Sequence, residues 1–264
     1  MTIKEVIERK AELKALKRLQ IKHSEGVSNT IQNKSITVKG KKPCKDGMEL
    51  ECLTVKIVGN TYNWLDSHGD VHVDGCFTKS IKENIDKIYH LDNHKHSFSD
   101  IVGKFEMIEE LPIKWSDLGV SKSGNTTCLV GTSEVEEDYN CKVFEAYQEN
   151  KINQHSVGMQ YVKIDLAVNS TDINSKEEKS IWDKYYPLLG NPEKADEEGY
   201  FWVVKEAKLL EISALLWDGS NSLTPTISIN IEPSEDDTQK NEPLKNTQTD
   251  EQKQFFINLL KQTK

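Results

Sequence analysis

The central part of the chain, residues 48–231, is built from short runs of β-favouring residues, and this pattern restricts the fold more than any other feature. Segments such as ELECLTVKIV, IVGKFEMIEE, TTCLVGTSEV and HSVGMQYVKIDL alternate in character and are separated by Gly, Asp and Ser. Alternation with a period of two is typical of strands. Helical spacing interrupts it in FTKSIKENIDKI, CKVFEAYQENKI and KEEKSIWDKYYPLL. We therefore expect an α+β fold with a mainly antiparallel β-barrel or β-sheet core and a few flanking helices.

The two ends of the chain differ from this central domain. Within residues 1–24 the spacing of Val6, Leu13, Leu16 and Leu19 predicts a basic amphipathic helix. Residues 25–47 are polar and without periodicity, so we interpret them as a linker. Residues 232–264 predict an acidic disordered tail that ends in a short amphipathic helix containing FFINLL.

Composition and charge exclude several classes of protein. A formal net charge of −9 argues against a nucleic-acid binder whose whole surface is basic. Five cysteines without CxxC spacing are best explained as reduced thiols. No run approaches the roughly 18 apolar residues that a membrane helix needs, and the charged N-terminus does not resemble a secretory signal. We expect a protein that works where it is made, without a membrane partner.

One serine stands out by its context. Ser156 opens an alternating strand directly after a predicted helix, and Gly158 two positions later leaves room for a backbone to approach a bound substrate. Ser156 by itself is weak evidence, because most serines are surface or capping residues. The adjacent His155 points to the opposite face of a strand, so a base for Ser156 has to come from elsewhere.

The segment HLDNHKH offers such a base. His90, Asp92, His94 and His96 recur at a period of two and would share one face if the segment is extended. Two interpretations remain open: a transition-metal site, or one catalytic histidine among solvated neighbours. Glu211 lies in the apolar run KLLEISALL, where a carboxylate is either paired or faces a cleft, because burying it unpaired is costly. An exposed glutamate at the edge of a sheet is the alternative.

Four blocks, in order, resemble the prohead (head maturation) serine proteases of tailed bacteriophages, which have a herpesvirus assemblin-like fold. The first block is NWLDSHGDVHVDGCFTKSI. It matches the N-terminal signature of that family at Asp66, Ser67, Gly69, Asp70, Gly75, Phe77 and Ser80.

The other three blocks carry the residues of the family's active site. LDNHKHSFSDIVGKF resembles the catalytic-histidine block and implies His94 as the base, although its spacing to Gly103 also suits His96. CKVFEAYQENKINQHSVGMQY resembles the nucleophile block and implies Ser156. KEAKLLEISALLWDGSN resembles the last block and implies Glu211 as the acidic member. The chain departs from the family pattern at Met159 and at residues 217–221.

The resemblance implies a serine endopeptidase without metal or cofactor, in which backbone N–H groups at Val157 and Gly158 are candidates for the oxyanion hole. It implies scaffold and major capsid precursors as substrates, self-cleavage, and a location in the host bacterial cytoplasm inside the immature head. No nucleic acid is required, and homo-oligomer formation is left open. Two alternative functions remain: a non-catalytic capsid-assembly module with the same fold, and a metal-dependent hydrolase that uses the His90–His96 cluster. We also expect an amphipathic terminal helix to dock onto scaffold or capsid protein.

Overall fold

The computed structural model describes residues 1–22, 42–43 and 51–230. Most of the predicted linker (25–47) and all of the predicted tail (232–264) lie outside the described residues. The central domain expected over residues 48–231 is described from Glu51 to Asn230. Within the described ranges no helix has the length and apolar character that crossing a bilayer requires.

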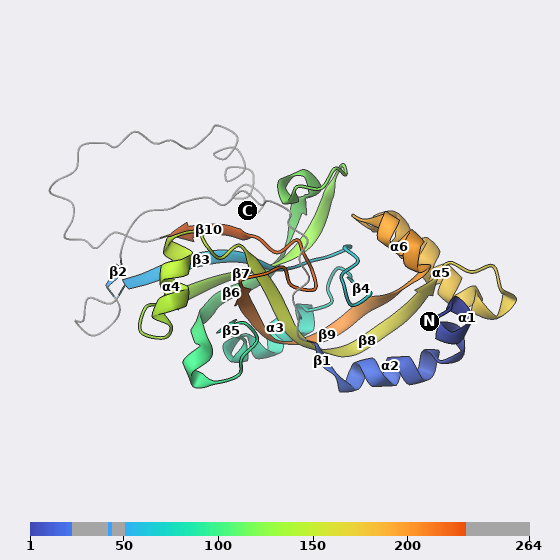
Figure 1. The fold of residues 1–264 in the computed structure, drawn as a ribbon, viewed down its shortest axis with the longest axis horizontal. Helices are drawn as coiled ribbons and strands as arrows, with labels where there is room; N and C mark the ends of the chain where they lie inside the picture. Colours follow the sequence, from blue (N-terminus) through green and yellow to red (C-terminus); the bar gives the residue numbers. More distant parts are fainter. Residues whose placement is uncertain (23–41, 44–50, 231–264) are drawn as a thin grey trace.

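One sheet contains all ten strands of the described chain (Figure 1). Its main path runs β1-β8-β9-β5-β6-β7-β3-β10, with β2 added to β3 and β4 added to β9. The pairing is antiparallel except where β4 and β5 run parallel to β9. The strands are β1 (Ile21–Lys22), β2 (Lys42–Pro43), β3 (Glu51–Thr61), β4 (Asp70–His72), β5 (Tyr89–Asp92), β6 (Ile101–Lys114), β7 (Asn125–Glu136), β8 (Gln154–Val168), β9 (Tyr200–Leu215) and β10 (Thr226–Asn230).

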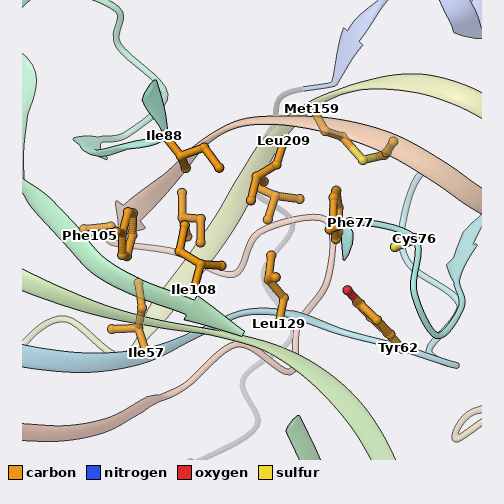
Figure 2. Close-up of a cluster of buried hydrophobic side chains, with 14 of the residues drawn as sticks. Ile57, Tyr62, Cys76, Phe77, Ile88, Phe105, Ile108, Leu129, Met159 and Leu209 are labelled. Atoms are coloured by element: carbon orange, nitrogen blue, oxygen red, sulfur yellow. The ribbon is translucent and has the colours of Figure 1, made fainter. Parts of the chain in front are cut away.

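The α+β, sheet-dominated fold expected from the sequence is confirmed, and of its two forms the sheet is found rather than the closed barrel. The sheet curls so that its two halves face each other across the main core. Figure 2 shows Ile57 and Leu129, from β3 and β7, on one side of this core and Leu209 and Met159, from β9 and β8, on the other. All four side chains are buried. Burial of the inner face explains the alternation seen in the sequence.

Helices pack against the sheet, most of them on β8 and β9. The helices after the N-terminal segment are α3 (Thr78–Asn84), α4 (Cys141–Gln148), α5 (Lys176–Tyr185) and α6 (Pro192–Glu198). Where β8 ends and β9 begins, there is a second apolar cluster, in which Trp182 of α5 packs on Phe201 of β9. The sequence did not predict α6, because only Ala195 of this helix is buried and no apolar periodicity marks it.

The N-terminal segment is part of the domain, which corrects the expectation of a separate helix on a tether. It forms two helices, α1 (Ile3–Glu8) and α2 (Lys10–Leu19), with a break at Arg9. Val6 is buried in the main core, and β1 then pairs antiparallel with β8. This segment is therefore packed on the domain, and the docking of a terminal helix onto scaffold or capsid protein stays a prediction.

A buried ion cluster anchors the end of this segment. Lys22 is buried and its Nζ contacts Asp66 Oδ2 and, at 2.9 Å, Asp70 Oδ2. Lys17 adds a contact of 2.6 Å to Asp70 Oδ1. Burial alone would raise the pKa of the Asp70 carboxyl, but Lys22 and Lys17 hold it well below its usual range. The two aspartates of the first sequence block thus bind the N-terminal segment to the sheet.

Candidate active site

Strand pairing brings the three predicted catalytic segments together. On β8 and β9, Ser156 lies directly opposite Ser213, and Gly158 lies opposite Glu211. Side chains that lie opposite each other in an antiparallel pair share one face of the sheet. Ser156, Ser213 and Glu211 therefore share a face, while the intervening Val157 belongs to the main apolar core on the other face. On its other side, this part of β9 pairs with β5, whose last residues lead to His94.

His94 lies in a turn immediately after β5. Its φ is +58°, and that of Asn93 is +49°, so both residues adopt the left-handed conformation that non-glycine residues seldom adopt. Two hydrogen bonds to β9 hold the turn: the Asn93 N–H donates to the Ala214 carbonyl at 3.0 Å, and the His94 N–H donates to Ser213 Oγ at 3.0 Å. The turn thereby aims the imidazole along β9.

The imidazole of His94 is paired with Glu211. Nδ1 lies 2.6 Å from Glu211 Oε1, and both side chains are almost completely buried. The second carboxylate oxygen accepts a hydrogen bond of 2.7 Å from the Ser213 hydroxyl. Both oxygens of this buried carboxylate are therefore satisfied. Because Nδ1–H donates to the carboxylate, Nε2 is left as the proton acceptor of the ring.

Gly158 leaves the space that this pair occupies. A Cβ on Gly158 would overlap Glu211 Oε1 and lie 2.7 Å from Cδ, so only glycine fits here. The oxygen that His94 contacts therefore lies over β8, two residues from Ser156 and on the same face. The sequence predicted that Gly158 leaves room for a backbone to approach a bound substrate, but the structure fills this space with the carboxylate of Glu211.

Ser156 itself is 3% exposed. The connection between β9 and β10 (residues 216–225) covers it: a Cβ on Gly219 would lie 3.0 Å from Ser156 Cβ and 3.2 Å from the His155 carbonyl oxygen. Asn221 fixes this β9–β10 connection by donating to Asn60 Oδ1 at 2.6 Å and to the Thr61 carbonyl at 2.7 Å. A peptide reaches Ser156 only if the connection shifts.

The four residues of the His90–His96 segment do not share a face, so the period-two interpretation is wrong. β5 ends at Asp92, and the left-handed turn redirects the chain. His90 is buried and contacts Ser133 and Tyr147, whereas His96 is exposed. In the part of the chain that the structure describes, no three His, Cys, Asp or Glu side chains are grouped so as to hold a metal ion. Of the two candidate bases, His94 is the one that contacts Glu211.

The two predicted oxyanion donors point in different directions. The N–H of His155 donates to Thr224 Oγ1 at 3.2 Å, away from β9. Because N–H direction alternates along a strand, the N–H of Val157 also points away from β9, and that of Gly158 points toward it. Gly158 therefore makes room for the carboxylate, and Val157 keeps an N–H directed out of the β8–β9 ladder.

Sequence reasoning assigned no role to Ser213 and Gly219. Ser213 joins Glu211 to the His94 turn, and its position two residues after Glu211 on a strand was the available signal. Gly219 had no such signal, because its contact with Ser156 depends on the path of a long connection.

No family model, curated protein or solved structure matches this chain, so its function is inferred from the residues and their geometry.

Proposed function

We propose that this chain is a serine endopeptidase in which Ser156 is the nucleophile, His94 the general base and Glu211 the residue that orients the base. The observation that carries the proposal is the 2.6 Å contact between His94 Nδ1 and Glu211 Oε1, made over Gly158 on the face of β8 that presents Ser156. A nucleophile, a base and a third group that orients the base is the arrangement used for acyl transfer on unrelated folds.

In the proposed reaction, His94 Nε2 takes the proton of the Ser156 hydroxyl as Oγ attacks the carbonyl carbon of a peptide bond. Glu211 stabilises the imidazolium that forms, and its own position is held by the Ser213 hydroxyl. His94 then gives the proton to the leaving amine, and an acyl-enzyme remains on Ser156. Water, activated by His94 in the same way, releases the acid product. The N–H of Val157 is the proposed backbone donor to the oxyanion.

The proposed substrates follow from the family resemblance. They are scaffold and major capsid precursors of a tailed phage, and the enzyme itself, cleaved inside the immature head in the host cytoplasm. The proposal involves no cofactor, and homo-oligomer formation remains open.

The test is co-expression of the chain with candidate scaffold and capsid precursors, followed by mass spectrometry of the products. Ser156→Ala should lower cleavage by several orders of magnitude, because the residues of a catalytic triad act as a unit. His94→Ala should have a similar effect. His96→Ala is the matched control, since His96 is exposed and should leave cleavage unchanged. Cleavage that persists in Ser156→Ala contradicts the proposal.

A non-catalytic capsid-assembly module is the second candidate, and the burial of Ser156 beneath Gly219 is the observation that favours it. A fluorophosphonate, which labels activated serines, separates the two. The protease proposal requires labelling at Ser156. An assembly module would remain unlabelled and would support head assembly equally well with alanine at position 156.

A further inference from the structure

A chain of hydrogen bonds runs through the interior on the other side of β8 from Ser156. Ser133 Oγ lies 3.0 Å from His90 Nδ1, and His90 Nε2 lies 3.1 Å from the Tyr147 hydroxyl. That hydroxyl lies 2.9 Å from His155 Nε2, and His155 Nδ1 lies 2.9 Å from the Thr224 carbonyl oxygen. All five residues are fully buried. Buried polar groups of this kind are costly unless every one is satisfied.

The chain has one consistent direction. The Thr224 carbonyl oxygen can only accept, so His155 carries its proton on Nδ1, and its Nε2 accepts from the Tyr147 hydroxyl. The Tyr147 oxygen then accepts from Nε2–H of His90, and His90 Nδ1 accepts from the hydroxyl of Ser133. Each imidazole is neutral and restricted to one tautomer. Burial lowers the pKa of His155 to about 4 and that of His90 well below its usual value, in agreement with neutral rings.

The five residues come from five different elements. Ser133 lies on β7, His90 on β5, Tyr147 on α4 and His155 on β8, and Thr224 lies in the β9–β10 connection. Two of these elements carry the proposed catalytic groups: β5 leads into the His94 turn, and β8 presents Ser156. The series of hydrogen bonds therefore crosses the interior from β5, which leads to the proposed base, to β8, which carries the proposed nucleophile.

Thr224 forms hydrogen bonds with three atoms of His155, the residue before Ser156. Its Oγ1 donates to the His155 carbonyl oxygen at 2.6 Å and accepts from the His155 N–H at 3.2 Å, and its own carbonyl accepts from the imidazole. The peptide group that joins His155 to Ser156 is thus fixed from outside the β8–β9 ladder. In the same connection, the backbone of Gly219 lies so close to Ser156 that an added Cβ would be 3.0 Å from Ser156 Cβ.

We propose that His90, Tyr147 and His155 are positioning residues, whose hydrogen-bond chain sets the distance between Ser156 on β8 and His94 after β5. This inference rests on the proposed protease function. Tyr147 is its central member, because its hydroxyl contacts both imidazoles. Removing that hydroxyl breaks the chain and leaves each imidazole with one unsatisfied nitrogen.

The test compares Tyr147→Phe with Tyr62→Phe in the full chain. Tyr62 is a matched control: it is equally buried, and its hydroxyl donates to Glu110 at 2.5 Å, which is not part of this series of hydrogen bonds. We expect kcat for peptide cleavage, and the rate of fluorophosphonate labelling, to fall about tenfold to a hundredfold in Tyr147→Phe with KM little changed, the effect of a sub-ångström to ångström displacement of reacting groups. Tyr62→Phe should keep both rates. Equal losses in the two variants would mean that Tyr147 is only structural.

A second measurement needs no variant and no activity. Nitrogen-15 NMR of the imidazoles of the wild-type chain should find His155 protonated at Nδ1 and His90 protonated at Nε2. The opposite tautomer on either ring overturns the inferred chain, even if Tyr147→Phe fails to fold. If Ser156 is not labelled in the wild type, the proposed function fails, and with it the positioning role. The tautomers still decide whether the series of hydrogen bonds exists.

Discussion

Replacement of Gly158 by alanine is the most direct test of how the site is built. The added methyl group would lie 2.7 Å from Cδ and 2.9 Å from Cγ of Glu211. Ordinary carbon–carbon contacts begin at about 3.5 Å. The carboxyl carbon therefore has to retreat by at least about 0.8 Å, the difference between 3.5 and 2.7 Å, and Oε1, which would lie only 2.0 Å from the methyl group, has to retreat farther; otherwise β8 has to move away from β9 by a similar amount.

Either movement separates the proposed catalytic groups. A hydrogen bond of 2.6 Å that lengthens by about 0.8 Å reaches the limit at which such bonds are counted. Displacements of about 1 Å lower enzymatic rates by about a hundredfold, so we expect a loss of that order in fluorophosphonate labelling at Ser156. Overpacking a buried site costs about 1–3 kcal/mol, so the variant should still fold.

The assay is the labelling rate, followed together with urea unfolding to confirm the folded state. Gly190→Ala is the matched control: its methyl group would lie 2.6 Å from the Trp115 indole, so it strains packing without displacing Glu211. In a Glu211→Ala background, Gly158→Ala should change the rate little further, because the displaced carboxylate is gone. Independent, multiplicative losses in the double variant would refute the reasoning.

Two further predictions concern stability. Lys22→Met removes the cation from buried Asp66 and leaves buried Asp70 with Lys17 alone, and it should lower the free energy of unfolding by about 3–5 kcal/mol. Lys163→Met, which removes an exposed ion pair, should lower it by less than about 1 kcal/mol, and equal losses in urea unfolding would contradict the buried role of Lys22. Burial lowers the pKa of His72 to about 3, with help from the Lys22 charge, and that of His155 to about 4. Between pH 6.5 and 4 the unfolded chain binds more protons at both histidines, so each should lower stability by about 1 kcal/mol per pH unit as the pH falls. Unfolding free energies that stay constant from pH 7 to 5 would contradict this.

The N-terminal segment illustrates the difference between local and long-range information. Its sequence predicted one helix within residues 1–24, and the structure has two, α1 and α2; helical structure could be predicted because helical spacing is a local property. Its attachment to the domain depends on Lys22 meeting Asp66 and Asp70, more than 40 residues away in the sequence. Nothing near Lys22 distinguishes it from the exposed lysines of the same segment, so a solvated face was the natural interpretation.

The proposed site divides in the same way. The sequence by itself determined the strands that carry Ser156 and Glu211 and the helix before β8, because alternation and helical spacing follow from which side chains are buried. It also reduced the candidates for the catalytic base to His94 and His96. A period of two could not reveal that β5 ends at Asp92, since a left-handed turn at Asn93 and His94 depends on hydrogen bonds to β9.

Only the tertiary structure decided which groups meet. The register of β8 against β9 puts Gly158 opposite Glu211, and a shift of one residue would put Glu211 on the other face. The path of the β9–β10 connection, which no local pattern encodes, buries Ser156 beneath Gly219 and brings Thr224 to His155. These contacts join segments about 50 to 120 residues apart, and their geometry is set by how the whole sheet curls around its core.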